Sequence, residues 1–216
     1  MMKKLLVTIL SFTLLFNLPA QASTNSYANQ AANELGRYGI IRIEENGEFR
    51  LESSVSRAVF VKTLLKAMHE SAGESKNEIF TDVPGKHWAN AYITRAYDMG
   101  IINGIGSGLF CPDAALTYSQ AVKMVVCALG YEELALMQGG YPSGYIMTAT
   151  RLGITDSINF LPDAEISQGD IAVMLESALD VPFMTYKDTD DAREYIISDG
   201  KNGTKLKTLR TLLESN

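Results

Sequence analysis

Apolar residues recur at helical spacing in several separate stretches of the chain. In one stretch Trp88, Tyr92, Ala96 and Met99 are spaced by four, four and three residues, and Gly100 follows as a C-terminal cap. The same spacing, again followed by a glycine, occurs in residues 27–38 and 141–152. The pattern predicts helices over 27–38, 89–99 and 142–152.

A second set of stretches begins with a hydroxyl residue and continues as an apolar-periodic run. Ser56, Thr117 and Ser167 each stand just before such a run, and Gln120 and Asp170 follow the last two at the third residue. A hydroxyl that accepts from the third backbone N–H is the usual start of a helix. Helices are therefore predicted over 57–68, 118–129 and 168–179.

These stretches form an internal repeat. Residues 27–69 align without a gap with residues 88–130, at an offset of 61 residues that pairs Lys62 with Lys123. A third copy lies 53 residues downstream in its first block and 50 in its second, so three residues are missing between Ile154 and Phe160, where a loop tolerates the loss. Three helix-loop-helix units that share a core make an all-α domain from about residue 25 to residue 181, with no sheet inside the repeats.

The last residues abandon the repeat. Residues 194–197 form a short strand-like stretch, and Leu206, Leu209 and Leu213 predict an amphipathic helix that begins near Thr204. The sequence leaves two possibilities for this segment: it docks on the repeats, or it begins a further module.

The first 22 residues have the pattern of a signal peptide. Lys3 and Lys4 precede an apolar run over residues 5–18, and Ala20, Gln21 and Ala22 form a small-residue cleavage site. We expect an exported chain that begins near Ser23 and has no membrane span after cleavage. The competing interpretation is an uncleaved membrane anchor.

Charge and composition exclude several functions. The formal net charge is −6, and removal of Lys3 and Lys4 makes it −8, so we expect no nucleic-acid partner. Cys111 and Cys127 fall in one repeat only, and the two histidines fall at unrelated places in the repeat. We therefore expect neither a metal site nor a cofactor, and because no catalytic pair of carboxylates or nucleophile with a base stands out, we expect no enzyme.

Three segments carry a resemblance to a known family. The segments are FTDVPGKHWA (80–89), GIINGIGSGLFCPDAALT (100–117) and the apolar helix that follows. From about residue 27 to residue 180 the chain resembles the S-layer homology (SLH) domains of bacterial envelope proteins. The predicted boundaries are a signal peptide at 1–22, SLH repeats at 23–70, 78–135 and 136–181, and a C-terminal tail of mixed structure at 182–216.

The resemblance implies a fold, a ligand and a location. It implies a pseudo-trimeric helical bundle shaped as a three-pronged spindle. It also implies a secreted protein of the cell wall or surface layer that binds secondary cell-wall polysaccharide, in particular pyruvylated sugars, in grooves between the repeats, and that meets other surface-layer proteins. The alternative hypothesis is an envelope scaffold that uses the same fold for protein contacts alone.

The family's Thr-Arg-Ala-Glu motif is only partly kept, and it singles out one cation. Arg57 is the only arginine that remains at this place, because Tyr118 and Gln168 stand at the equivalent positions. We expect Arg57, with free backbone N–H groups in the first turn of its helix, to grip a carboxylate. The other interpretation is an exposed arginine that shields the helix.

The remaining candidate binding residues have structural interpretations as well. The aromatic residues Tyr27, Trp88 and Tyr141 recur either as core residues, which we favour, or as platforms for a sugar. Acidic residues before helices act as sugar ligands or as caps. The full set of candidate carbohydrate-binding residues is Arg57, Ser56, Trp88, Asp82, Asp113, Thr117, Asp163 and Ser167.

Overall fold

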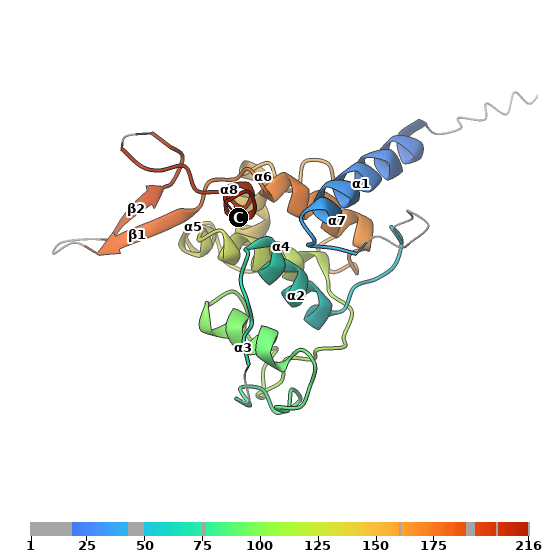
Figure 1. Cartoon of the computed structure of the whole chain (residues 1–216), viewed down its shortest axis with the longest axis vertical. Helices are drawn as coiled ribbons and strands as arrows, with labels where there is room; N and C mark the ends of the chain where they lie inside the picture. Colours follow the sequence, from blue (N-terminus) through green and yellow to red (C-terminus); the bar gives the residue numbers. More distant parts are fainter. Residues whose placement is uncertain are drawn as a thin grey trace, which may run out of the picture.

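The computed structural model describes residues 19–42, 50–74, 77–159, 161–188, 193–201 and 203–215. Residues 1–18 of the predicted signal peptide lie outside this range. In the described residues helices predominate, and a single two-stranded hairpin projects from one side of the helical body (Figure 1). Within the same residues no helix is long and apolar enough to cross a membrane.

All six predicted helices are present. They are α1 (Pro19–Arg37), α2 (Arg57–Ala67), α3 (Asn90–Asp98), α4 (Tyr118–Ala128), α6 (Ser143–Arg151) and α7 (Gln168–Ala178). The sequence pattern missed α5 (Glu132–Met137), whose six residues are too few to display a helical period. The glycines that end three of these helices adopt φ values of +69°, +72° and +74° at Gly39, Gly100 and Gly153, as the capping prediction requires.

The predicted N-caps of α2, α4 and α7 are confirmed. The hydroxyls of Ser56, Thr117 and Ser167 accept from the third backbone N–H of their helices. At Thr117 the Gln120 side chain also accepts from the backbone N–H of the cap, which completes a capping box. Local sequence thus fixes where each of these three helices begins.

Backbone hydrogen bonds join the starts of these three helices in a cycle. The first two N–H groups of each helix donate to carbonyls in a loop that precedes another of the three helices. The pairs are Arg57 to Ala114 (3.0 Å) and Ala58 to Pro112 (2.9 Å), Tyr118 to Ala164 (3.0 Å) and Ser119 to Pro162 (3.1 Å), and Gln168 to Ser53 (2.8 Å) and Gly169 to Leu51 (2.9 Å). The start of α2 binds the loop before α4, the start of α4 binds the loop before α7, and the start of α7 binds the loop before α2. These hydrogen bonds therefore form a closed ring of three helix starts.

One hydrophobic core runs through the bundle, but the aromatic residue that begins each of three predicted apolar stripes lies outside it. The aromatic residues Tyr27, Trp88 and Tyr141 are 36%, 51% and 52% exposed, so their interpretation as core residues is wrong. In α3 and the residue before it, the buried stripe is Ala89, Ile93 and Ala96 instead. This stripe also has helical spacing, and the pattern alone could not separate two neighbouring stripes.

The C-terminal segment docks on the helical body. Strands β1 (Met184–Asp188) and β2 (Arg193–Ile197) form an antiparallel hairpin, in which β2 covers the predicted strand. The predicted helix from Thr204 is shorter: α8 (Leu209–Leu213) begins after Thr208, and Leu206 stays exposed. The Met184 N–H donates to the Leu129 carbonyl at 2.9 Å, which holds β1 against the end of α4.

Candidate functional site

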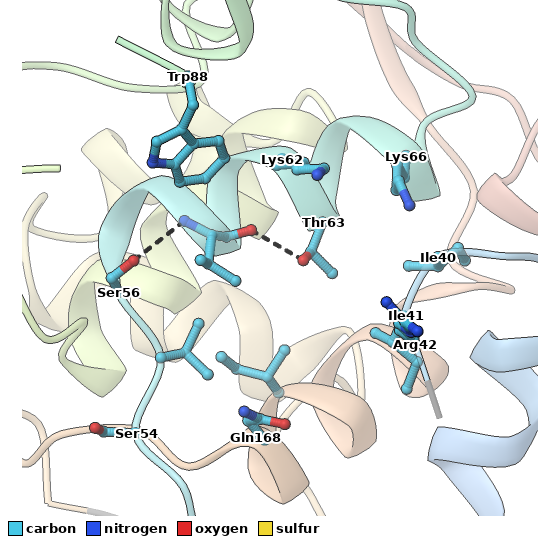
Figure 2. Close-up of a pocket in the computed structure, with 13 residues that line it drawn as sticks. Ile40, Ile41, Arg42, Ser54, Ser56, Lys62, Thr63, Lys66, Trp88 and Gln168 are labelled. Carbon is cyan, nitrogen blue, oxygen red and sulfur yellow. Dashed lines mark hydrogen bonds between the residues drawn. The ribbon is translucent and has the colours of Figure 1, made fainter. Parts of the chain in front are cut away.

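Two pockets lie beside the starts of helices α2 and α4. The first, groove A, has a volume of about 330 Å³ and lies between α2, the segment after α1, the start of α7 and Trp88 (Figure 2). Its residues are Ile40, Ile41, Arg42, Ser54, Val55, Ser56, Val59, Lys62, Thr63, Lys66, Trp88, Gln168 and Ile171. Buried Ile40, Val55 and Ile171 give the groove an apolar part.

Cations and an aromatic ring surround this apolar part. The Lys62 ammonium lies 5.7 Å from the centroid of the Trp88 ring and 5.5 Å from that of Tyr92. Lys66, one turn further along α2, donates to the Gly39 carbonyl at 3.2 Å and is exposed, as is Arg42. Figure 2 shows Trp88 near Ser56 at the start of α2 and Arg42 toward the Lys66 end. The groove therefore combines an aromatic face with three positive charges.

The second pocket, groove B, has a volume of about 300 Å³ and repeats this arrangement beside α4. Its residues are Arg57, Ile101, Ile102, Asn103, Gly104, Ile105, Gln120, Lys123, Met124 and Tyr141. The sequence alignment pairs Lys123 with Lys62 and Tyr141 with Trp88. Arg57, at the start of α2, stands in groove B where Gln168, at the start of α7, stands in groove A.

Arg57 is held inside the protein. Its residue is only 4% exposed, its Nε donates to the Phe110 carbonyl at 2.9 Å, and its Cζ lies 4.5 Å from the centroid of the Phe110 ring. Burial lowers the pKa of Arg57, although an arginine stays charged. The exposed-arginine interpretation is therefore wrong. The expectation of free N–H groups in the first turn is wrong as well, because the N–H groups of Arg57 and Ala58 already donate to loop carbonyls.

Asp82 holds the loop that Arg57 contacts. Its two carboxylate oxygens accept from the backbone N–H of Phe110 at 2.9 Å and of Cys111 at 2.6 Å. Burial by itself would raise the pKa of Asp82, but these backbone donors outweigh it and lower the pKa below its ordinary value of 3.8. The carboxylate faces backbone donors at a loop, which is a structural arrangement.

The remaining candidate residues separate by location. Ser56 and Trp88 line groove A, whereas Thr117 and Ser167 cap their helices and line neither groove. Asp113 and Asp163 are exposed in the turns before α4 and α7, also outside both grooves. The structure thus brings Ser56 and Trp88 together in one groove and places Arg57 in the other.

Sequence reasoning missed most of the cations of the grooves. Lys62 and Lys123 were visible as an aligned pair at the offset of 61 residues, and that alignment was the only signal for them. Arg42 and Lys66 carry no such signal, because Asn103 and Cys127 stand at their equivalent positions. Within the described ranges no group of three or more His, Cys, Asp or Glu side chains could hold a metal ion.

Comparison with known proteins identifies one domain and several relatives. The S-layer homology domain matches residues 79–122, which include Asp82, Trp88 and the start of α4. The chain is 32% identical over 202 residues to a cell surface protein of Thermoanaerobacter kivui, covering 87% of this chain and 26% of the relative. It is 30% identical over 158 residues to the middle cell wall protein of Brevibacillus brevis, covering 72% of this chain and 15% of the relative.

A third relative is also a surface protein. The chain is 29% identical over 196 residues to a surface layer protein of Brevibacillus choshinensis, covering 85% of this chain and 17% of the relative. The chain therefore spans about a quarter or less of the length of these relatives. Residues 79–122 thus contain an S-layer homology domain, and over most of its length the chain is similar to cell-surface and surface-layer proteins.

Proposed function

We propose that this chain attaches an exported protein non-covalently to the bacterial cell wall by binding secondary cell-wall polysaccharide in grooves A and B. The observation that carries the proposal is the position of the Lys62 ammonium, 5.7 Å from the ring of a half-exposed tryptophan in an open groove. An aromatic face stacks on the apolar face of a sugar, and an ammonium beside it attracts an acidic substituent such as a pyruvyl carboxylate.

The relatives support the location. Their names place them at the cell surface, in the middle cell wall and in a surface layer. We propose the same cell-surface location for this chain, with other surface-layer proteins as its neighbours. A role in binding rather than catalysis also fits these names.

We further propose that the helices form three SLH repeats, 23–70, 78–135 and 136–181, around a pseudo-threefold axis. The cyclic hydrogen bonds between the starts of α2, α4 and α7 support this arrangement, because the same pair of donors is used three times. Grooves between neighbouring repeats then occur at related places, as the shared lysine and aromatic positions of grooves A and B indicate.

An alternative role is an envelope scaffold that works through protein contacts alone. The hairpin favours it, because Tyr186, Tyr195 and Ile197 are 58%, 41% and 47% exposed on one face, where Tyr186 pairs with Tyr195 and Met184 with Ile197. This surface shares no residue with grooves A and B.

Sedimentation with cell walls tests the proposal. The purified protein is expected to sediment with walls that retain their secondary polysaccharide and to remain in solution with walls from which the polysaccharide has been chemically removed. Equal sedimentation with both preparations would contradict polysaccharide binding. It would favour the scaffold role if a second surface-layer protein captured the chain.

A further inference from the structure

The three helix-loop-helix units carry different charges at positions that match in the repeat. After the first helix of each unit stand Arg42, Asn103 and Asp156. On the second turn of α2, α4 and α7 stand Lys62, Lys123 and Val173, and one turn further stand Lys66, Cys127 and Ser177. At these three positions, three cations beside α2 thus correspond to one beside α4 and to none beside α7.

The pocket at the start of α7 is acidic rather than basic. Its volume is about 440 Å³, and among the residues that the structure describes its lining includes Tyr118, Glu165 and Asp170 but no lysine or arginine. Tyr118 stands where Arg57 stands in groove B, and nearby the Tyr27 hydroxyl donates to Glu176 at 2.9 Å. A carboxylate on a ligand would meet like charges at this place.

We infer that groove A is the principal site for an acidic sugar, that groove B is a weaker second site, and that the pocket beside Tyr118 takes no acidic sugar. The inference rests on the proposed function and assigns it to particular grooves. The ligand class is a pyranose with a carboxylate substituent, whose ring lies on Trp88 and whose carboxylate meets Lys62, with Arg42 and Lys66 adding positive potential.

The cations of groove B are less available than those of groove A. The Arg57 guanidinium is engaged with the carbonyl and the ring of Phe110. With its amide oriented to satisfy its neighbours, Asn103 accepts from the Lys123 ammonium at 3.0 Å. In groove A the position of Asn103 is taken by Arg42, which adds a positive charge where groove B has a neutral partner for its lysine.

Substitutions at the three matching positions test the inference. The variants are Lys62→Ala, Lys123→Ala and Val173→Ala. The probe is a synthetic hexose that bears a pyruvate acetal, with its uncharged methyl ester as the control ligand, and binding is measured by titration calorimetry at fixed salt. Circular dichroism confirms that each variant is folded, and Lys62→Gln serves as a second variant that keeps most of the side-chain length.

We expect the acid to bind the wild-type protein more tightly than the ester. Lys62→Ala is expected to lose about ten- to a hundredfold in affinity for the acid, because it removes a charge-assisted hydrogen bond. Lys123→Ala is expected to lose less than about fivefold, and Val173→Ala to bind like the wild type. Because Trp88 is the only tryptophan, its fluorescence is also expected to change as the acid binds to the wild type and to Lys123→Ala.

The contrary results are distinct from a failure of the proposed function. If Lys123→Ala loses as much as Lys62→Ala or more, or if the ester binds as tightly as the acid, the assignment to groove A is overturned while wall attachment stands. If the wild-type protein also fails to sediment with intact walls, the proposed function fails and the inference fails with it.

Discussion

At the residue scale, the charged side chains of Arg57 and Asp82 hold one loop by hydrogen bonds to its backbone. Arg57 binds the carbonyl of Phe110 and covers its ring, while Asp82 binds the backbone N–H groups of Phe110 and Cys111. Both the backbone N–H and the carbonyl of Phe110 are therefore hydrogen-bonded to a charged side chain. The neighbouring carbonyls of Pro112 and Ala114 accept from the start of α2, so this loop also positions Arg57, which lines groove B.

The lowered pKa of Asp82 predicts a dependence of stability on pH. The folded protein holds the carboxylate in its charged form more strongly than the unfolded chain does, so its contribution is complete above the ordinary pKa of 3.8 and is lost as the pH falls through the lower, folded-state pKa. Asp82→Asn is expected to lower the free energy of unfolding by about 1–3 kcal/mol at pH 7. The difference from the wild type should shrink below about pH 4.

Urea denaturation over a pH series measures this effect. Asp113→Asn is the control, because Asp113 is an exposed carboxylate in a turn of the same loop. Equal unfolding free energies for Asp82→Asn and Asp113→Asn at pH 7 would contradict the loop-holding role of Asp82.

At the element scale, the short helix α8 joins the first and the last helices of the body. The Arg210 guanidinium binds Asp180 through two nitrogens, at 2.6 and 2.9 Å, and also binds Glu34 of α1. These partners, with Asp180 first, raise the pKa of Arg210. The Arg210 N–H donates to the Leu179 carbonyl at 2.9 Å, and neighbouring Leu209 is fully buried. The C-terminal segment is thus part of the folded body.

Removal of this ion-pair cluster is expected to loosen α8. Arg210→Ala should lower the free energy of unfolding by about 1–3 kcal/mol, because it leaves Glu34 and Asp180 without their shared cation. Hydrogen exchange should become faster at the amides of α8 than at those of α4. Thermal or urea denaturation gives the stability, and mass spectrometry gives the exchange.

Arg193→Ala is the matched control for this variant. Arg193 pairs with Asp188 and Glu133 but lies on the exposed hairpin, where solvent screens an ion pair and its loss has little effect on stability. If both arginine variants are destabilised equally, or if exchange in α8 does not change, the joining role of Arg210 is wrong.

At the scale of the whole molecule, the cyclic hydrogen bonds and the shared core make the repeats interdependent. Helix α1, which comes first in the chain, packs against α7, which comes more than a hundred residues later (Figure 1). Buried residues from every helix of the body belong to one hydrophobic cluster. A defect in one helix should therefore weaken all of them.

Leu35→Ala in α1 tests this cooperativity. Leu35 is fully buried, so truncation to alanine is expected to cost about 2–5 kcal/mol. The fluorescence of Trp88, beside α3, and the far-ultraviolet circular dichroism are expected to shift together to lower urea. Separate transitions for the two probes would instead show repeats that unfold independently.

The sequence by itself determined the helices of the repeats and their ends. A hydroxyl cap, an apolar period and a closing glycine act within a few residues of one another, so Ser56, Thr117, Gly39 and Gly100 could be interpreted without the fold. It also determined the family resemblance, and with it the expectation of grooves between repeats. The short helix α5 was not predicted, because its six residues are too few to display a helical period.

Only the tertiary structure decided which side chains face the grooves. Burial of Arg57 depends on Phe110, 53 residues away, and its first-turn N–H groups are occupied by carbonyls from that same distant loop. Exposure of Trp88 and the approach of Lys62 depend on how α2 packs beside α3. Local pattern cannot specify these contacts, because two neighbouring stripes of a helix satisfy the same period and only the packing of the other helices selects the buried one.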